Sequence, residues 1–176
     1  MNIDAIETRA LDLLDKSGCL EVPVPVKSVI KFLDIKLSPY DLGDDVSGVL
    51  VVNKGECKIG YNSTESLVRQ RFTLAHEVGH FWLHLDNKEQ ELFVDDSKYM
   101  FRKQGGTKSQ EYKKEMQANQ FAAALLMPKC LIQKEIELLD NGIINDHDLI
   151  VALSKKFKVS QISMTYRLNN LGFLYA

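Results

Sequence analysis

The stretch RFTLAHEVGHFWLH, residues 71–84, contains the pattern H-E-x-x-H. Residues four apart lie one turn apart on the same face of a helix, so the imidazoles of His76 and His80 can reach one metal ion. Glu77 projects from an adjacent angle, close enough to act on a water held by that ion without being a ligand itself. The pattern therefore predicts a metal-binding helix rather than two histidines that only fill a core.

The remaining residues of this helix place both histidines on one face, which we expect to point to the interior. That face comprises Phe72, Ala75, His76, Gly79, His80 and Leu83. An unpaired polar group in a core costs about 1–3 kcal/mol, so buried histidines need partners. Gly79 costs about 1 kcal/mol relative to alanine inside a helix. Close approach of another backbone would explain why glycine stands there.

Two histidines are too few for a catalytic zinc ion, which usually takes three protein ligands and keeps one position for water. His84 is a poor third ligand because it lies eight residues from His76, which is about 12 Å along a helix axis. It also lacks the spacing of the H-E-x-x-H-x-x-G-x-x-H pattern. We interpret His84 as a residue that packs at the end of the helix or interacts with its dipole.

Glu115 is the better candidate for the third ligand. It lies on a second predicted helix, where it shares a face with Ala118, Asn119, Ala122 and Leu125. A buried carboxylate is costly unless it is paired or bound to a metal. Asn119, one turn further on, is placed to accept a hydrogen bond from the free N–H of a ligand histidine. The alternative is an exposed Glu115 in the charged run at the start of this helix.

Hydrophobic periodicity and turn residues predict a helix-rich α+β domain with one small antiparallel sheet. A β-hairpin is expected with strands at 46–53 and 58–61. Helices are expected at 3–16, 25 or 26 to 33, 110–127, 131–139, 146–157 and 161–171, and a long helix is expected to begin at the N-cap residues 62–64 and to end at 84. Residues 86–110 are polar and contain Gly105-Gly106. We expect no secondary structure there, in either a mobile lid or a solvated insertion.

Composition excludes several classes of protein. The 176 residues include 22 Lys+Arg and 24 Asp+Glu, for a net charge of −2, which favours neither a general nucleic-acid scaffold nor a polybasic membrane binder. Cys19, Cys57 and Cys130 form no C-x-x-C pair, so neither a disulfide framework nor a cysteine zinc cluster is expected. No signal-peptide core is present, and no apolar run approaches the roughly 18 residues that cross a membrane. We expect a soluble, cytoplasmic protein.

Two blocks of the sequence resemble the ImmA/IrrE family of metallo-endopeptidases. They are RFTLAHEVGH at 71–80 and EMQANQFAAALLMP at 115–128, and the resemblance covers most of the chain, to the tail at 159–172. The resemblance implies a zincin-like metallopeptidase core, which we place at 1–128. A helix-turn-helix-like region at 129–176 would then pack on the core or next to it.

The resemblance also implies a site and a substrate. Zn²⁺ would be held by His76, His80 and Glu115, with Glu77 as the general base and Asn119 as a partner of a ligand histidine. Proteins of this family are often encoded on phages or other mobile elements, or act as stress regulators. They cleave a helix-turn-helix repressor of the Xre type and so relieve repression of transcription.

Four residues are candidates for the donor that stabilises an oxyanion: Arg167, Tyr166, Tyr61 and His84. The strand at 58–61 is a candidate to pair with an extended substrate by β-augmentation.

A rival function is a non-catalytic module, stabilised by zinc, that binds a repressor or DNA through the C-terminal helices. Residues 146–176 hold four Lys/Arg and two Asp, whereas about 6–10 phosphate contacts are typical of DNA binding. We therefore do not expect direct binding of nucleic acid, and expect these helices to pack against or flank the core.

Overall fold

The computed structural model describes residues 1–43, 45–85, 90–96, 110–139 and 145–174. Its elements are α1 (Ile3–Ser17), α2 (Val26–Phe32), β1 (Lys36–Tyr40), β2 (Val46–Asn53), β3 (Glu56–Asn62), α3 (Leu67–His84), β4 (Gln90–Asp96), α5 (Gln110–Leu126), α6 (Lys129–Leu138), α7 (Asp146–Phe157) and α8 (Gln161–Leu171). The predicted fold class, helix-rich α+β with a small sheet, is confirmed.

The four strands form one sheet in the order β1-β3-β2-β4. Strands β2 and β3 are the predicted antiparallel hairpin. Strand β1, however, runs parallel to β3, so the sheet is mixed rather than antiparallel. Because β3 has a neighbour on each side, its backbone groups are already paired. The expectation that residues 58–61 accept an extended substrate strand is therefore wrong.

Strand β4 corrects a second expectation. It lies within 86–110, where we predicted no secondary structure, and it pairs antiparallel with β2. The rest of that stretch, 86–89 and 97–109, lies outside the described residues, so the suggestion of a lid stays a prediction.

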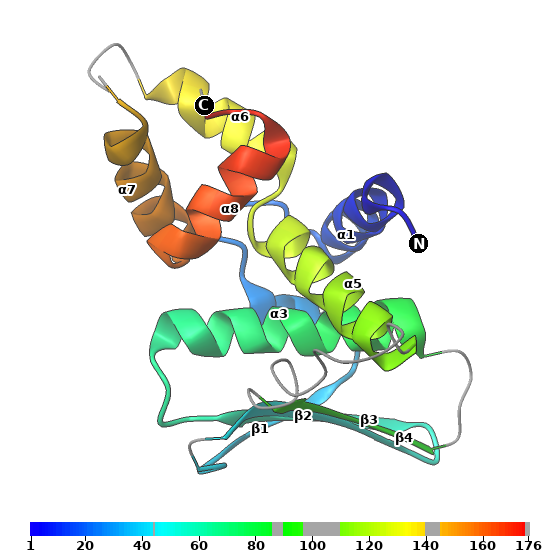
Figure 1. The fold of residues 1–176 in the computed structure, drawn as a ribbon. Coiled ribbons are helices and arrows are strands. Elements are labelled where there is room, and N and C mark those ends of the chain that lie inside the picture. The colour runs from blue at the N-terminus through cyan, green and yellow to red at the C-terminus, as the bar shows by residue number, and fades with distance from the viewer. Residues whose placement is uncertain (44, 86–89, 97–109, 140–144, 175–176) are drawn as a thin grey trace.

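Helix α3 lies between the sheet and α5 (Figure 1). All eight residues from Thr73 to His80 are buried, whereas a helix at a surface would bury only one face. The sheet contributes Leu50 and Ile59 to the core on one side, and α5 contributes Phe121 and Leu125 on the other. The H-E-x-x-H motif is thus buried between the sheet and α5.

The start of α3 differs from the expected N-cap. The cap is Ser66, whose hydroxyl accepts a hydrogen bond from the backbone N–H of Arg69 at 3.3 Å. Asn62 instead stabilises the turn before the helix, because its Oδ1 accepts from the N–H of Thr64 at 3.1 Å. Both are N-cap residue types, and only one of them can stand at the position where helical geometry begins.

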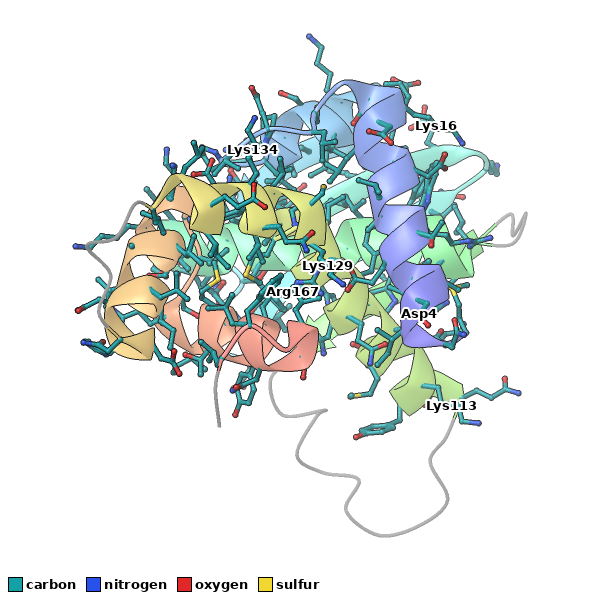
Figure 2. The ribbon with its side chains drawn as sticks, turned by 90° about the horizontal axis from the view of Figure 1, so that it is seen from above. Asp4, Lys16, Lys113, Lys129, Lys134 and Arg167 are labelled. Atoms are coloured by element: carbon teal, nitrogen blue, oxygen red, sulfur yellow. The ribbon has the colours of Figure 1, made fainter. Side chains whose placement is uncertain are left out.

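The C-terminal helices are tied to the rest of the fold by two arginines. Arg71 on α3 donates to the backbone oxygens of Lys158, at 3.2 Å, and Val24, at 3.0 Å. Arg167 on α8 lies inside the helical layer (Figure 2) and donates to the oxygen of Met127 at 2.9 Å. Whether 129–176 is a separate unit stays a prediction. Within the described part of the chain, no helix is both long and apolar enough to cross a membrane.

Candidate metal centre

The centre depends on a close crossing of α3 and α5. A Cβ atom on Gly79 would lie 3.1 Å from both the Cα and the carbonyl oxygen of Ala118, and 3.3 Å from the Cβ of Phe121. These distances confirm that another backbone approaches Gly79. The absence of a side chain there brings the two helices close enough for residues on both to share one site.

His76 and His80 on α3 meet Glu115 on α5. Nε2 of His76 lies 3.3 Å from Oε2 of Glu115, Nε2 of His80 lies 3.1 Å from Oε1, and the two Nε2 atoms lie 2.9 Å apart. Their ligand atoms all lie within 4.8 Å of one another, and the histidines are buried. The structure therefore brings together the three ligands named from the sequence, and they are a candidate metal-binding triad.

Asn119 orients the first of these histidines. Nδ1 of His76 lies 2.9 Å from Oδ1 of Asn119, and an amide oxygen can only accept a hydrogen bond. His76 therefore carries a proton on Nδ1. In the neutral ring its Nε2 then has a lone pair directed at the Glu115 carboxylate. Two electron-rich atoms 3.3 Å apart need a cation or a second proton between them, and this requirement fits a metal ion.

The charge of the Glu115 carboxylate also fits a metal ion. Burial raises the pKa of Glu115, but hydrogen bonds from His76 and His80 and the charge of these histidines outweigh it and lower that pKa to about 2. The Glu115 carboxylate is anionic at neutral pH, as a metal ligand must be.

Glu77 is fully buried and faces the sheet, which packs on the side of α3 opposite α5. A Cβ atom at Gly48 on β2 would lie 3.1 Å from its Oε1. The candidate metal ligands His76 and His80 thus meet Glu115 of α5, whereas the Glu77 carboxylate faces the sheet. Gly48 is absent from the residues predicted from the sequence. A glycine inside a strand pattern is the signal that could have identified it, because it often marks close approach of another group.

His84 is not part of the triad. Its Nε2 donates to the backbone oxygen of Lys114 at 3.1 Å, and burial lowers its pKa to about 4, so it is neutral at pH 7. The expected role, packing at the end of the helix, is confirmed.

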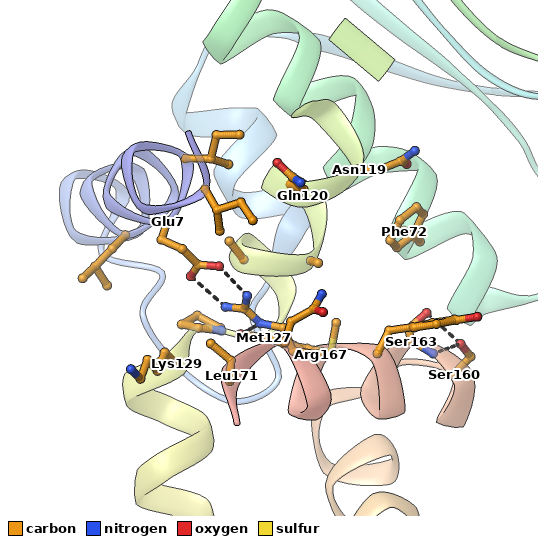
Figure 3. A pocket seen from close by; sticks show the side chains of 18 of the residues that line it. Glu7, Phe72, Asn119, Gln120, Met127, Lys129, Ser160, Ser163, Arg167 and Leu171 are labelled. Carbon is orange, nitrogen blue, oxygen red and sulfur yellow. Dashed lines mark hydrogen bonds and ion pairs between the residues drawn. The ribbon is translucent and has the colours of Figure 1, made fainter. Parts of the chain in front are cut away.

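Arg167 is also committed elsewhere: its guanidinium pairs with the carboxylate of Glu7, with Nη2 2.8 Å from Oε2 (Figure 3). This pair lines a cavity of about 1600 Å³ between α1, α3, α5, α6 and α8. Asn119 lies on the wall of that cavity, but the triad does not.

A comparison with curated proteins finds no match. A comparison with protein families finds one that covers residues 33–169, Peptidase_M78, described as the IrrE N-terminal-like domain. The match includes both helices of the candidate metal centre and most of the C-terminal helices. It spans well over half of the 176 residues. The chain therefore belongs to the IrrE N-terminal-like metallopeptidase family, the family that its two sequence blocks resemble.

Proposed function

We propose that this protein is a zinc-dependent endopeptidase that cleaves a regulatory protein, an Xre-type helix-turn-helix repressor, and so relieves repression of transcription in the cytoplasm. The observation that carries the proposal is the convergence of His76, His80 and Glu115. Two histidines and a glutamate form the ligand set of a catalytic zinc site, with one position left for water.

The distances in the triad fit zinc. Ligand atoms bound to one ion at about 2.0–2.2 Å in tetrahedral geometry lie about 3.3–3.6 Å from one another. The three separations in the structure, 2.9, 3.1 and 3.3 Å, reach the lower end of that range or fall up to about 0.4 Å short of it. Nitrogen and carboxylate donors also suit zinc better than Mg²⁺ or Ca²⁺, which take oxygen ligands. Small movements of flexible side chains are enough to bind the ion.

Each residue then has a role in peptide hydrolysis. Zn²⁺, when bound, would lower the pKa of a water to about 7 and polarise the carbonyl of the scissile peptide bond. Glu77 accepts a proton from the attacking water and returns it to the leaving amine nitrogen. Asn119 keeps His76 in the tautomer that presents Nε2 to the ion. The buried position of these groups restricts the access of bulk water to the reaction.

The choice of a DNA-binding protein as substrate rests on the family resemblance and on charge. A net charge of −2 suits an enzyme that acts on a basic protein better than one that binds DNA itself. The rival proposal, a zinc-stabilised module that binds a repressor or DNA, would use the C-terminal helices, among them α7 and α8, which are joined by a turn at Lys158.

The decisive experiment incubates the protein with the helix-turn-helix repressor encoded next to its gene. Wild type, Glu77→Gln and the exposed control Glu137→Gln are compared after the zinc content of each is measured. Cleavage by wild type and Glu137→Gln, with zinc retained and cleavage lost in Glu77→Gln, supports the peptidase. Zinc bound by all three proteins without cleavage by any of them supports the binding module.

A further inference from the structure

The residue that faces the Glu77 carboxylate is a glycine in the middle of the sheet. Gly48 lies on β2 and pairs with Tyr61 of β3. A Cβ atom there would lie 2.4 Å from Cγ2 of Thr73 and 3.1 Å from Oε1 of Glu77. Real Cβ atoms do not approach a methyl carbon that closely, so any side chain at 48 requires movement of α3 or of its side chains.

The two contacts differ in their consequences. Thr73 is a β-branched residue, fully buried and held in a helix, so its methyl group has little freedom to rotate away. Glu77 is also fully buried, but its carboxylate ends a longer side chain. A methyl group at 48 therefore has two effects: it strains the packing at Thr73, and it displaces the carboxylate of Glu77.

The strand is anchored beside this point. Ser47 is the extra residue of a β-bulge, because Val46 and Gly48 pair with consecutive residues of β4. Its hydroxyl donates to Oε1 of Glu65 at 2.7 Å and accepts from Nη2 of Arg69 at 2.9 Å. Bulges commonly re-aim a side chain beside a functional site. Here the bulge ties β2 to the start of α3, so the strand cannot simply move away from Glu77.

We propose that Gly48 is a positioning residue for Glu77. Because residue 48 has no side chain, the carboxylate of Glu77 can occupy the place from which it transfers protons. The steric part of this inference stands on the distances alone. The catalytic part rests on the proposed function, in which Glu77 is the general base.

The test is Gly48→Ala, with Gly60→Ala as the matched control. Gly60 lies in the same sheet and its Cβ would lie 3.1 Å from the ring of Tyr40, an exposed side chain that can move. We expect Gly48→Ala to bind one zinc ion as wild type does, with KM for the repressor unchanged. We expect kcat to fall at least about 10-fold, because misplacement of a catalytic group by about 1 Å costs on the order of 100-fold. Gly60→Ala should keep wild-type kcat.

A second variant separates positioning from folding. Gly48→Ala/Thr73→Ser removes the methyl group at the 2.4 Å contact and leaves the contact with Glu77. We expect the double variant to regain thermal stability but not kcat. Recovery of kcat together with stability would show that Gly48 serves packing only, and would overturn the inference.

A crystal structure of Gly48→Ala supplies a readout that needs no activity. We expect the Glu77 carboxylate to be displaced from its wild-type place while the His76 and His80 rings stay. An unmoved carboxylate would also overturn the inference. Absence of cleavage by wild-type protein would instead contradict the proposed function, and the displacement would still be measurable. The two failures are therefore distinguishable.

Discussion

Replacement of Gly79 by alanine is expected to destabilise the protein, although alanine is the better helix former. In an exposed helix this change stabilises by about 1 kcal/mol. Here the new methyl group would lie 3.1 Å from two backbone atoms of Ala118, which cannot rotate away. Overpacking costs about 1–3 kcal/mol, and contact with backbone favours the upper end. We therefore expect a net loss of about 1–2 kcal/mol.

The assay is thermal unfolding of the metal-free protein, followed by zinc competition with a chelator. For a chain of this size about 1 kcal/mol corresponds to about 2–4 °C, so Tm should fall by about 2–8 °C. Zinc affinity should fall too, because Glu115 lies one turn before Ala118 on the helix that is pushed away. Lys113→Ala, at an exposed position on α5, is the control and should stay within about 0.5 kcal/mol. An unchanged or higher Tm for Gly79→Ala would refute the close crossing.

Three further predictions concern single contacts. Asn119→Ala removes the acceptor that orients His76 and should weaken zinc binding about 10–100-fold, measured by chelator competition. The pKa of His84 is about 4 in the fold and 6.5 in the unfolded chain, so the unfolded chain takes up a proton first and stability is lost as the pH falls from 6.5 towards 4. Over that range the free energy of unfolding in urea should fall by up to about 3 kcal/mol more for wild type than for His84→Gln. Arg167→Met breaks the half-buried pair with Glu7 and should cost about 2 kcal/mol of stability, yet leave kcat for the repressor unchanged at a temperature where the variant is folded.

The helices were predictable because their ends carry local signals. Helices α7 and α8 have the expected bounds, since Asn145 and Ser160 cap their first turns and Gly172 ends the second. Strands β1 and β4 escaped prediction. β1 is five residues long and contains Pro39, which argues against a strand except at an edge. β4 is defined by its pairing with β2, which no local pattern reports.

Some residues of the candidate site could likewise be predicted from local sequence, whereas others depend on contacts between distant elements. His76, His80, Glu115 and Asn119 were predictable because helical spacing alone places each pair on one face, and a carboxylate among small residues is costly without a partner. What could not be predicted is which element covers the other side of α3. The contact of Gly48 with Glu77 depends on the register of a strand against a helix. The pairing of Glu7 with Arg167 joins residues 160 apart in sequence.

The two glycine contacts constrain α3 from opposite sides, and this restricts how the site can vary. His76 and Glu77 are adjacent in sequence, so they point about 100° apart around one helix axis. A rotation or shift of α3 therefore moves His76, the candidate metal ligand, and Glu77, the proposed proton acceptor, together. At Gly79 the contact is with the backbone of α5, so a side chain there should move helices and change both zinc affinity and kcat. At Gly48 the nearest atoms belong to side chains, so a methyl group there should change kcat and leave zinc affinity as it is. The two variants, measured side by side, separate the placement of the metal from the placement of the proton acceptor on one helix.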